Sequence, residues 1–177
     1  MDAIDMLLHR RSCRQFTDEQ ISDADLTTVV DFGLAAPTGM NQQSTKIVIV
    51  QEPEKIKLLS KLNATIMNTD SDPFYGAPTV CLILTPKVAD YNANSMSLNP
   101  MKDGSLVIGA MQNAAYALGL GSCWINRCKE MLLLPEGQKI LKELGLEDYE
   151  GVGCVVLGKP KRQASGKKIK PGRVIRW

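Results

Sequence analysis

Residues 104–118 predict the longest helix of the chain, and this helix has almost no polar face. Asp103 precedes the helix as a candidate N-cap, and Gly119-Leu120-Gly121 ends it. Gln112 and Asn113 are nearly its only polar residues, and the others are small or aliphatic. A helix that is apolar nearly all round is buried on several sides. A chain of 177 residues has few elements to provide that cover. We therefore expect a partner subunit to cover one side.

Helical and β-branched segments alternate along the rest of the chain. Ser22 and Asp25 form a capping box for a helix that we expect to reach Ala36. Residue periodicity predicts further helices over 2–9, 53–62 and 135–144, and strands over 45–51, 79–85, 122–125 and 151–157. We expect a loop over the polar stretch 87–102. This alternation is typical of an α/β or α+β fold. Since no linker or repeat divides the chain, we expect a single domain over residues 1–177.

Charge and cysteine usage exclude several classes of protein. A net charge of +2 and 44% hydrophobic residues argue against disorder and against broad binding to nucleic acid. No apolar run reaches the ~18 residues of a membrane span, and the N-terminus lacks the apolar core of a signal peptide. The five cysteines are odd in number and include no Cys-x-x-Cys pair, and only one histidine is present. We expect a cytoplasmic protein without a metal site or a membrane partner.

Arg10-Arg11-Ser12-Cys13-Arg14 concentrates three guanidiniums and a hydroxyl near the end of the first predicted helix. Guanidiniums present fixed forks of donors that suit phosphate oxygens. The same cluster also fits a solvated helix end, where cations interact favourably with the helix dipole. An anion-binding site and a simple helix terminus are both open at this point.

Motifs for acid–base or nucleotide chemistry are missing from the sequence. There is no nucleophile elbow, no Walker loop and no dinucleotide glycine fingerprint. The single histidine and the lack of a cluster of carboxylates argue against a hydrolase that uses acid–base catalysis. An enzyme with so few catalytic groups of its own usually obtains its chemistry from a cofactor.

Five segments in chain order resemble motifs of the FMN-dependent nitroreductase family. Residues 10–16, Arg-Arg-Ser-Cys-Arg-Gln-Phe, are similar to its Arg-Arg-Ser-x-Arg-x-Phe opening. Residues 36–43, Ala-Pro-Thr-Gly-Met-Asn-Gln-Gln, are similar to its Ala-Pro-Ser/Thr-x-x-Asn-x-Gln segment. The remaining three are Tyr75-Gly76-Ala77-Pro78 before a strand, residues 118–125 (Leu-Gly-Leu-Gly-Ser-Cys-Trp-Ile), and Gly158-Lys159-Pro160 as the Gly-x-Pro exit. The resemblance covers essentially the whole chain.

This resemblance implies a three-layer α+β fold with a mostly antiparallel sheet flanked by helices. It also implies an intertwined homodimer that binds two FMN molecules at its interface. By resemblance, Arg10 and Ser12 hold the FMN phosphate, with Arg11 close by. Arg14 reaches the pyrimidine edge of the flavin, where a cation stabilises the negative charge of the reduced ring.

Further site residues follow from the same resemblance. The residues that approach the flavin ring from the other subunit are Pro37, Thr38, Asn41 and Gln43. Asp103 matches a position that contacts the ribityl chain, and the backbone of Ile125 and Asn126 faces flavin N5 and O4. Lys168 and Lys170 occupy the place of a basic pair that completes the phosphate site. Asn63 is a candidate for an asparagine that touches the ring in related proteins.

Simpler roles are open for several of these residues. Asp103 fits a plain helix N-cap, and Asn41 fits a turn former. The basic tail fits a disordered arm that binds nucleic acid or acidic partners. Val174, Ile175 and Trp177 argue against such an arm, because they predict a strand that packs.

The function that the resemblance implies is oxidoreduction. NADH or NADPH passes a hydride through FMN to a nitroaromatic, a quinone or a similar small acceptor, by a ping-pong mechanism. The alternatives are a flavin-binding or storage protein without efficient turnover, and a basic interaction domain without a cofactor.

Overall fold

The computed structural model describes residues 3–88, 99–162 and 169–177. Its centre is a sheet in the order β1-β2-β4-β3, in which every neighbouring pair is antiparallel. The strands are β1 (Lys46–Val50), β2 (Thr79–Pro86), β3 (Gly121–Ile125) and β4 (Tyr149–Gly158). The helices are α1 (Ala3–His9), α2 (Asp23–Leu34), η1 (Gly39–Asn41, a 3₁₀ turn), α3 (Pro53–Met67), α4 (Asn99–Ala117), α5 (Cys128–Leu133) and α6 (Pro135–Glu143).

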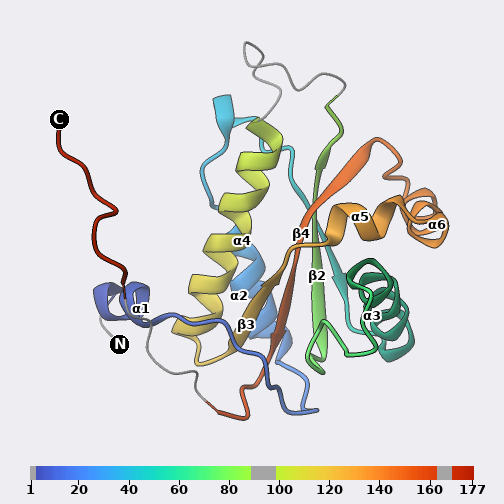
Figure 1. The fold of residues 1–177 in the computed structure, drawn as a ribbon, viewed down its shortest axis with the longest axis horizontal. Coiled ribbons are helices and arrows are strands. Elements are labelled where there is room, and N and C mark those ends of the chain that lie inside the picture. The colour runs from blue at the N-terminus through green and yellow to red at the C-terminus, as the bar shows by residue number, and fades with distance from the viewer. Residues whose placement is uncertain (1–2, 89–98, 163–168) are drawn as a thin grey trace.

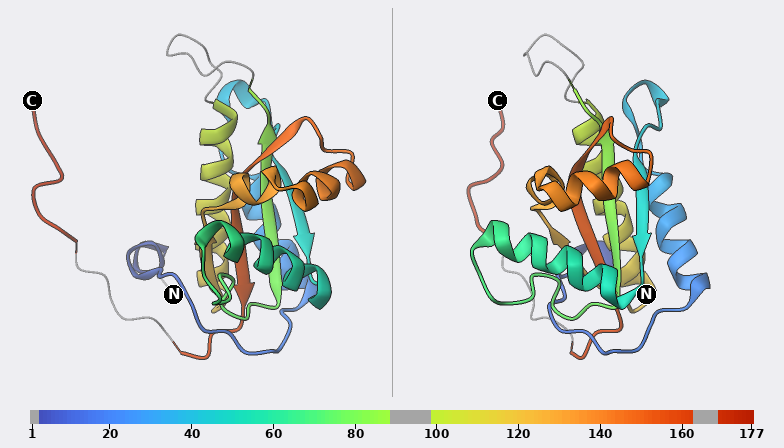
Figure 2. Two further views of the ribbon diagram at one scale, coloured as in Figure 1. Left: turned by 45° about the vertical axis from the view of Figure 1, so that its right-hand side comes forward. Right: turned by 90° about the vertical axis from the view of Figure 1, so that its right-hand side faces the viewer.

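Helices cover both faces of this sheet, which gives three layers. Figure 1 and Figure 2 show α2 and α4 on one face and α3, α5 and α6 on the other. The two central strands are buried on both faces, since successive side chains point to opposite sides. Leu82 and Val156 join the core under α3 and α5, whereas Ile83 and Val155 join the core under α2 and α4. The predicted α+β fold with an antiparallel sheet is confirmed.

Local sequence signals place most elements correctly. The Ser22 hydroxyl oxygen accepts the Asp25 backbone N–H at 3.1 Å, which is the N-cap bond of the predicted capping box. The Asp25 carboxylate accepts the Ser22 hydroxyl at 2.7 Å instead of the Ser22 backbone N–H that a full capping box uses. The four predicted strands are each present within about two residues of the expected bounds.

Several expectations about helices are wrong. Asp103 is not an N-cap, because α4 begins at Asn99 and residues 99–102 are therefore helical instead of loop. The third helix continues to Met67 instead of ending near residue 62, and α5 was not expected. Of the stretch 87–102, residues 89–98 lie outside the described residues.

The C-terminal tail does not form the packed strand that its apolar residues predict. Val174 and Ile175 are 85% and 90% exposed, and no strand is assigned over residues 169–177. Figure 1 and Figure 2 show this segment projecting away from the body of the molecule, on the same side as α1. Across the described ranges, none of the helices combines the length and apolar character needed to cross a membrane.

Candidate functional site

The arginine-rich segment leaves α1 and runs along the outer edge of β3. The Cys13 N–H donates to the Ser122 carbonyl at 2.8 Å. Further on, the Thr17 N–H donates to the Lys159 carbonyl at 2.9 Å, and the Lys161 N–H to the Gln15 carbonyl at 3.0 Å. Backbone hydrogen bonds at Cys13 and at the residues that follow it therefore hold residues 10–14, which we call the arginine end, against β3 and the segment after β4.

Close packing behind the arginine end requires glycine at position 121. A Cβ on Gly121 would lie 2.8 Å from both Cβ and Sγ of Cys13 and 3.0 Å from the Phe16 ring. Phe16 is 2% exposed and also lies against Gly158. Real Cβ contacts of this length are not tolerated without movement of the neighbour. The Gly-Leu-Gly-Ser segment thus permits the arginine end to approach β3.

The guanidiniums of Arg10 and Arg11 differ in how far their donors are used. Arg11 Nη1 donates to the carbonyls of Leu8 and Arg10, at 2.8 and 2.7 Å, and so caps the C-terminus of α1. Arg11 Nε and Arg10 Nη1 are buried, and neither has a hydrogen-bond partner among the described residues. Buried donors of charged groups are normally paired. The bonds of Arg11 Nη1 thus fit the interpretation of the cluster as a helix end. The two unpaired donors, Arg11 Nε and Arg10 Nη1, fit its interpretation as an anion-binding site.

Cys123 on β3 lies within the electrostatic field of the arginine end. Burial raises the pKa of its thiol. The positive charge of Arg14, a hydrogen bond with the Ser12 side chain and the charge of Arg10 each lower that pKa in part. The structure therefore brings Arg10, Ser12 and Arg14 together around one point of β3.

Arg14 is exposed, and its guanidinium lies over the ring of Tyr75, 5.9 Å from the ring centroid. Tyr75 belongs to the turn between α3 and β2, which Asp72 holds through the backbone N–H groups of Phe74 and Gly76, at 2.9 and 2.6 Å. The sequence singled out Tyr75-Gly76 only as part of a motif. Its contact with Arg14 was missed, because no local pattern links the two residues.

Residues 37–43, which we call the loop end, are held by α4. Both carboxylate oxygens of Asp103 accept the Gly39 N–H at 3.0 Å. The Thr38 hydroxyl accepts the Gln43 N–H at 3.2 Å, and the Gln43 side chain donates to Asn41 Oδ1 at 2.9 Å. Asn41 has a φ of +54°, which asparagine tolerates better than most residues. The turn-forming role of Asn41 is therefore present, as is a structural role for Asp103 that differs from an N-cap.

A single chain does not bring the arginine end and the loop end together. Figure 1 shows the loop end beside the first turns of α4 and the arginine end near its last turns. The 19 residues of α4 span about 28 Å at the usual helical rise. Residues of the loop end therefore cannot join the arginine end within one protomer.

The remaining predicted site residues belong to the end of β3 and to the C-terminal tail. Ile125 is 7% exposed at the end of β3, and Asn126 is exposed immediately after it. Ile125 is therefore the last residue of the strand that the arginine end flanks, and Asn126 follows it. Lys170 is exposed in the tail, and Lys168 lies outside the described residues.

Asn63 on α3 is a further polar residue without a partner. Its side chain is fully buried, and neither Nδ2 nor Oδ1 has a hydrogen-bond partner in the described part of the chain. A buried side-chain amide without hydrogen-bond partners lowers the stability of the fold unless a ligand or a water molecule forms those hydrogen bonds.

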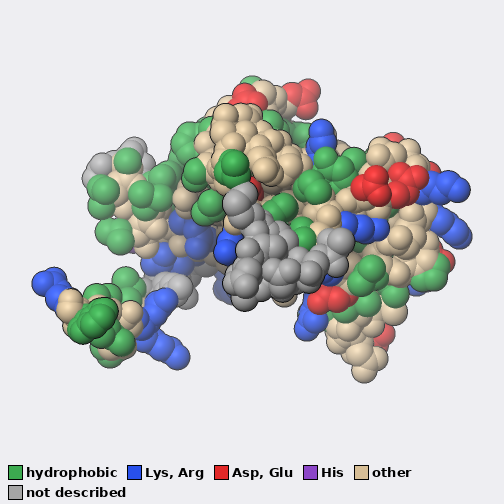
Figure 3. Space-filling view, turned by 90° about the horizontal axis from the view of Figure 1, so that it is seen from above, with side chains coloured by type: hydrophobic (Ala, Val, Ile, Leu, Met, Phe, Trp, Pro, Cys, Tyr) green, Lys and Arg blue, Asp and Glu red, His purple; other side chains and the backbone are tan. Residues whose placement is uncertain are grey.

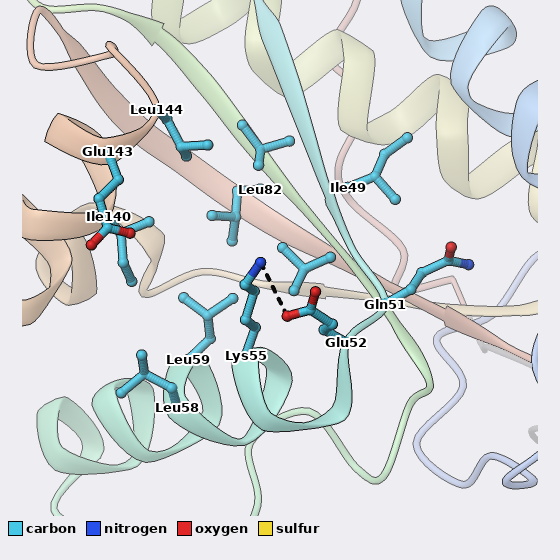
Figure 4. Close-up of a pocket in the computed structure, with 12 residues that line it drawn as sticks. Ile49, Gln51, Glu52, Lys55, Leu58, Leu59, Leu82, Ile140, Glu143 and Leu144 are labelled. Carbon is cyan, nitrogen blue, oxygen red and sulfur yellow. Dashed lines mark ion pairs between the residues drawn. The ribbon is translucent and has the colours of Figure 1, made fainter.

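An apolar groove of about 470 Å³ lies elsewhere, between β1, α3 and α6. Figure 4 shows Leu58, Leu59 and Ile140 along it, with the Lys55–Glu52 ion pair (3.0 Å) at its rim. None of the predicted site residues lines this groove.

Solved structures share the whole fold. A nitroreductase from Bacteroides fragilis, solved with bound FMN, matches with a TM-score of 0.85 at 24% identity, covering 100% of this chain and 99% of that chain. An FMN-dependent nitroreductase from Clostridium difficile matches with a TM-score of 0.80 at 26% identity, covering 99% of each chain. The fold is thus that of the nitroreductase-like α+β proteins.

The family itself follows from the sequence comparison. The chain belongs to the nitroreductase family, whose model matches residues 7–159. A protein from Archaeoglobus fulgidus, named for an inferred NADH dehydrogenase or NAD(P)H nitroreductase activity, is 29% identical over 90% of this chain and 86% of its own length. An FMN reductase [NAD(P)H] from Bacillus subtilis is 23% identical over 98% of this chain and 72% of its own length. The resemblance stated from the motifs is confirmed.

Proposed function

We propose that this chain is an FMN-dependent NAD(P)H oxidoreductase. The observation that carries the proposal is the pair of buried guanidinium donors, Arg10 Nη1 and Arg11 Nε, that have no partner among the described residues. The FMN phosphate supplies the acceptors that such donors require. Membership of the nitroreductase family and the FMN reductase relatives support the same cofactor and donor.

The residues of the arginine end fit the two charged parts of FMN. Arg10 and Ser12 would hold the phosphate, with Arg11 beside them and Lys168 and Lys170 of the tail completing the site. Arg14 would lie at the pyrimidine edge of the ring. Ile125 and Asn126 would offer their backbone to the ring from the end of β3. The unpaired amide of Asn63 supports its assignment as an additional ligand contact.

The loop end would come from a second copy of the chain. Pro37, Thr38, Asn41 and Gln43 would approach the ring from the partner subunit, and Asp103 would hold them in place while facing the ribityl chain. The distance between the two ends of α4 supports this arrangement, since one chain cannot bring both to one ligand.

Exposed apolar side chains also support a homodimer. Leu106 on α4 is 49% exposed, and a side chain on Gly109, one turn further on the same face, would meet open space. Ile4, Leu7 and Leu8 are between 53% and 61% exposed on α1. Figure 3 shows hydrophobic side chains gathered over this projecting helix, with Lys and Arg side chains between it and the body of the molecule. Contiguous exposed apolar surface of this kind marks interaction sites.

When bound, FMN would supply the transfer of a hydride from reduced nicotinamide to the acceptor. The role of Arg14 is to stabilise the negative charge that the reduced ring carries. We assign no general acid: the single histidine, His9, lies on α1 with its Nδ1 2.7 Å from the Asp5 carbonyl. Water supplies the proton at an open site. Donor and acceptor use the same site in turn, which gives ping-pong kinetics, and the acceptor is a nitroaromatic, a quinone or a similar flat molecule.

All five cysteines are free thiols, which supports a reducing cytoplasmic location.

The test is a visible spectrum of the purified full chain, followed by anaerobic titration with NADH and with NADPH. We expect flavin bands that disappear on adding one or both donors and return on adding a quinone or a nitroaromatic. Parallel lines in double-reciprocal plots would support the ping-pong order. Bound flavin that stays oxidised would indicate a storage protein, and a colourless protein that FMN cannot reconstitute would contradict the proposal.

A further inference from the structure

Asp72 ties the turn before β2 firmly to α3. Its Oδ1 accepts the Ser60 hydroxyl at 2.6 Å and the Phe74 N–H at 2.9 Å, and its Oδ2 accepts the Gly76 N–H at 2.6 Å. Phe74 is fully buried in the core under α3 and α5. The residue between Phe74 and Gly76 therefore has little freedom to move.

Tyr75 is held in an unfavourable backbone conformation by this turn. Its φ is +58°, which is uncommon for a bulky residue. Such a conformation persists only where the surrounding contacts over-determine it, and it clusters at functional positions. Its consequence here is geometric: the ring is 37% exposed and lies beneath the Arg14 guanidinium, 5.9 Å from carbon to centroid.

Among the described residues, no hydrogen bond or ion pair is found for the Arg14 side chain, and the Tyr75 ring is the aromatic face that it contacts. A carboxylate partner would cancel the charge of Arg14 and occupy its donors. An aromatic face instead attracts the cation through its quadrupole and leaves the N–H donors free. It also restricts a long side chain that would otherwise sample many rotamers.

We infer that Tyr75 is a positioning residue for Arg14: its ring, fixed by the Asp72 turn, holds the guanidinium in place with its charge and donors available for the ligand. The identity of that ligand as the flavin pyrimidine edge rests on the proposed function. The contact between the two side chains does not depend on it.

The variants are Tyr75→Asn, Tyr75→Phe, Arg14→Ala and the double variant of Arg14→Ala with Tyr75→Asn. Asparagine removes the ring and tolerates positive φ, so it adds no backbone strain. Phenylalanine keeps the ring and is the matched control. The first measurement is urea unfolding of the apoprotein as a double-mutant cycle. We expect a coupling of about two- to fivefold in the unfolding equilibrium constant, as for an exposed cation–π pair. Its absence would overturn the inference.

The second measurement uses the FMN-loaded protein and the ratio of reduced to oxidised flavin, poised against a dye of fixed potential. Tyr75→Asn should lower this ratio about two- to fivefold, in the same direction as Arg14→Ala, with no further loss in the double variant. Tyr75→Phe should match the wild type. Additive losses, or a wild-type ratio in Tyr75→Asn, would overturn the inference. Coupling in the apoprotein without any FMN binding would contradict the proposed function alone and leave Tyr75 as the residue that positions Arg14.

Discussion

The two ends of α4 show opposite solutions to the placement of polar groups. At the loop end, polar groups bond within the chain: Asp103 binds the Gly39 N–H with both oxygens, and Gln43 binds Thr38 and Asn41. At the arginine end, Arg10 and Arg11 keep buried donors without partners in the described ranges. Internal hydrogen bonds thus fix the conformation of the loop end. The arginine end has positively charged donors that an external anion would pair.

This difference explains why neither end is a complete site. The arginine end has positive charge but no residues placed to contact the face of a flat ring, and the loop end has such residues but no positive charge. A flat anionic cofactor needs both. Under the proposed function, pairing the arginine end of one chain with the loop end of another would supply both. The exposed apolar face of α4 between the two ends is the surface through which we expect the copies to meet.

The largest effect should follow from blocking that surface. Leu106→Arg places a charge where we expect the second copy to pack, and burying an unpaired charge costs several kcal/mol. The dimer dissociation constant should rise by at least about 100-fold, with FMN binding lost at the same protein concentration. Sedimentation velocity with absorbance at flavin wavelengths measures both. Leu133→Arg, at a leucine that is 62% exposed on α5, is the matched control and should stay dimeric and yellow. A yellow monomeric Leu106→Arg variant would separate cofactor binding from dimerisation.

The next effect concerns the arginine end alone. Arg10→Ala should weaken FMN binding about 10- to 100-fold, because hydrogen bonds to charged groups contribute about 1.5–3 kcal/mol. The apoprotein should lose no stability, since a buried donor without a partner disappears with the guanidinium. Isothermal titration with FMN and urea unfolding of the apoprotein give the two numbers. Lys55→Ala, at the rim of the apolar groove, controls for the loss of one positive charge. An apoprotein destabilised by several kcal/mol would show that Arg10 is structural instead.

A smaller effect should follow at the loop end. Asp103→Asn keeps a hydrogen bond to the Gly39 N–H but removes its ionic character, which roughly halves its strength. We expect faster amide exchange at Gly39 and FMN binding weakened about threefold. The exchange rates near Cys13 should not change. Equal effects at both ends would contradict the division into charge and shape.

The smallest effect is electrostatic. Arg14 lowers the pKa of Cys123 in opposition to burial, so Arg14→Ala should move that pKa further above its ordinary value of 9.0. At a fixed alkaline pH the thiolate fraction, and with it the alkylation rate of Cys123, should fall. Peptide mapping after alkylation over a pH series measures this. Asp103→Asn should leave the profile of Cys123 unchanged, because it lies at the other end of α4; a shift in that variant would contradict the separation of the two ends.

Sequence reasoning succeeded where the determining contacts are local. The strands follow from β-branched runs, and the helix at Ser22 follows from a capping box whose partners are three residues apart. Sequence reasoning failed at Asp103. This residue looks like an N-cap from its neighbours in sequence, but its carboxylate accepts a hydrogen bond from the Gly39 N–H, 64 residues away. α5 was missed because six residues are too few to show a helical period.

The candidate site shows the same limit. The family motifs indicate that Arg10, Arg11 and Arg14 belong together, yet their guanidiniums have different surroundings. Arg10 has a buried Nη1 without a partner among the described residues, Arg11 donates to the carbonyls of Leu8 and Arg10, and Arg14 lies over the Tyr75 ring. Those differences depend on neighbours that are distant in sequence. The expected packing of Val174, Ile175 and Trp177 is not found, because their apolar side chains stay exposed against the part of the chain that the structure describes.

Complementation between two defective chains tests most directly whether each site combines both ends. One chain carries Arg10→Ala, and the other carries Asn41→Ala with Gln43→Ala, so that each homodimer binds FMN weakly. Refolding the two together under distinct affinity tags isolates the mixed dimer. Because one of its two sites then contains an intact arginine end and an intact loop end, we predict one FMN per dimer at wild-type affinity. A mixed dimer that binds no FMN at wild-type affinity would show that each site lies within a single chain.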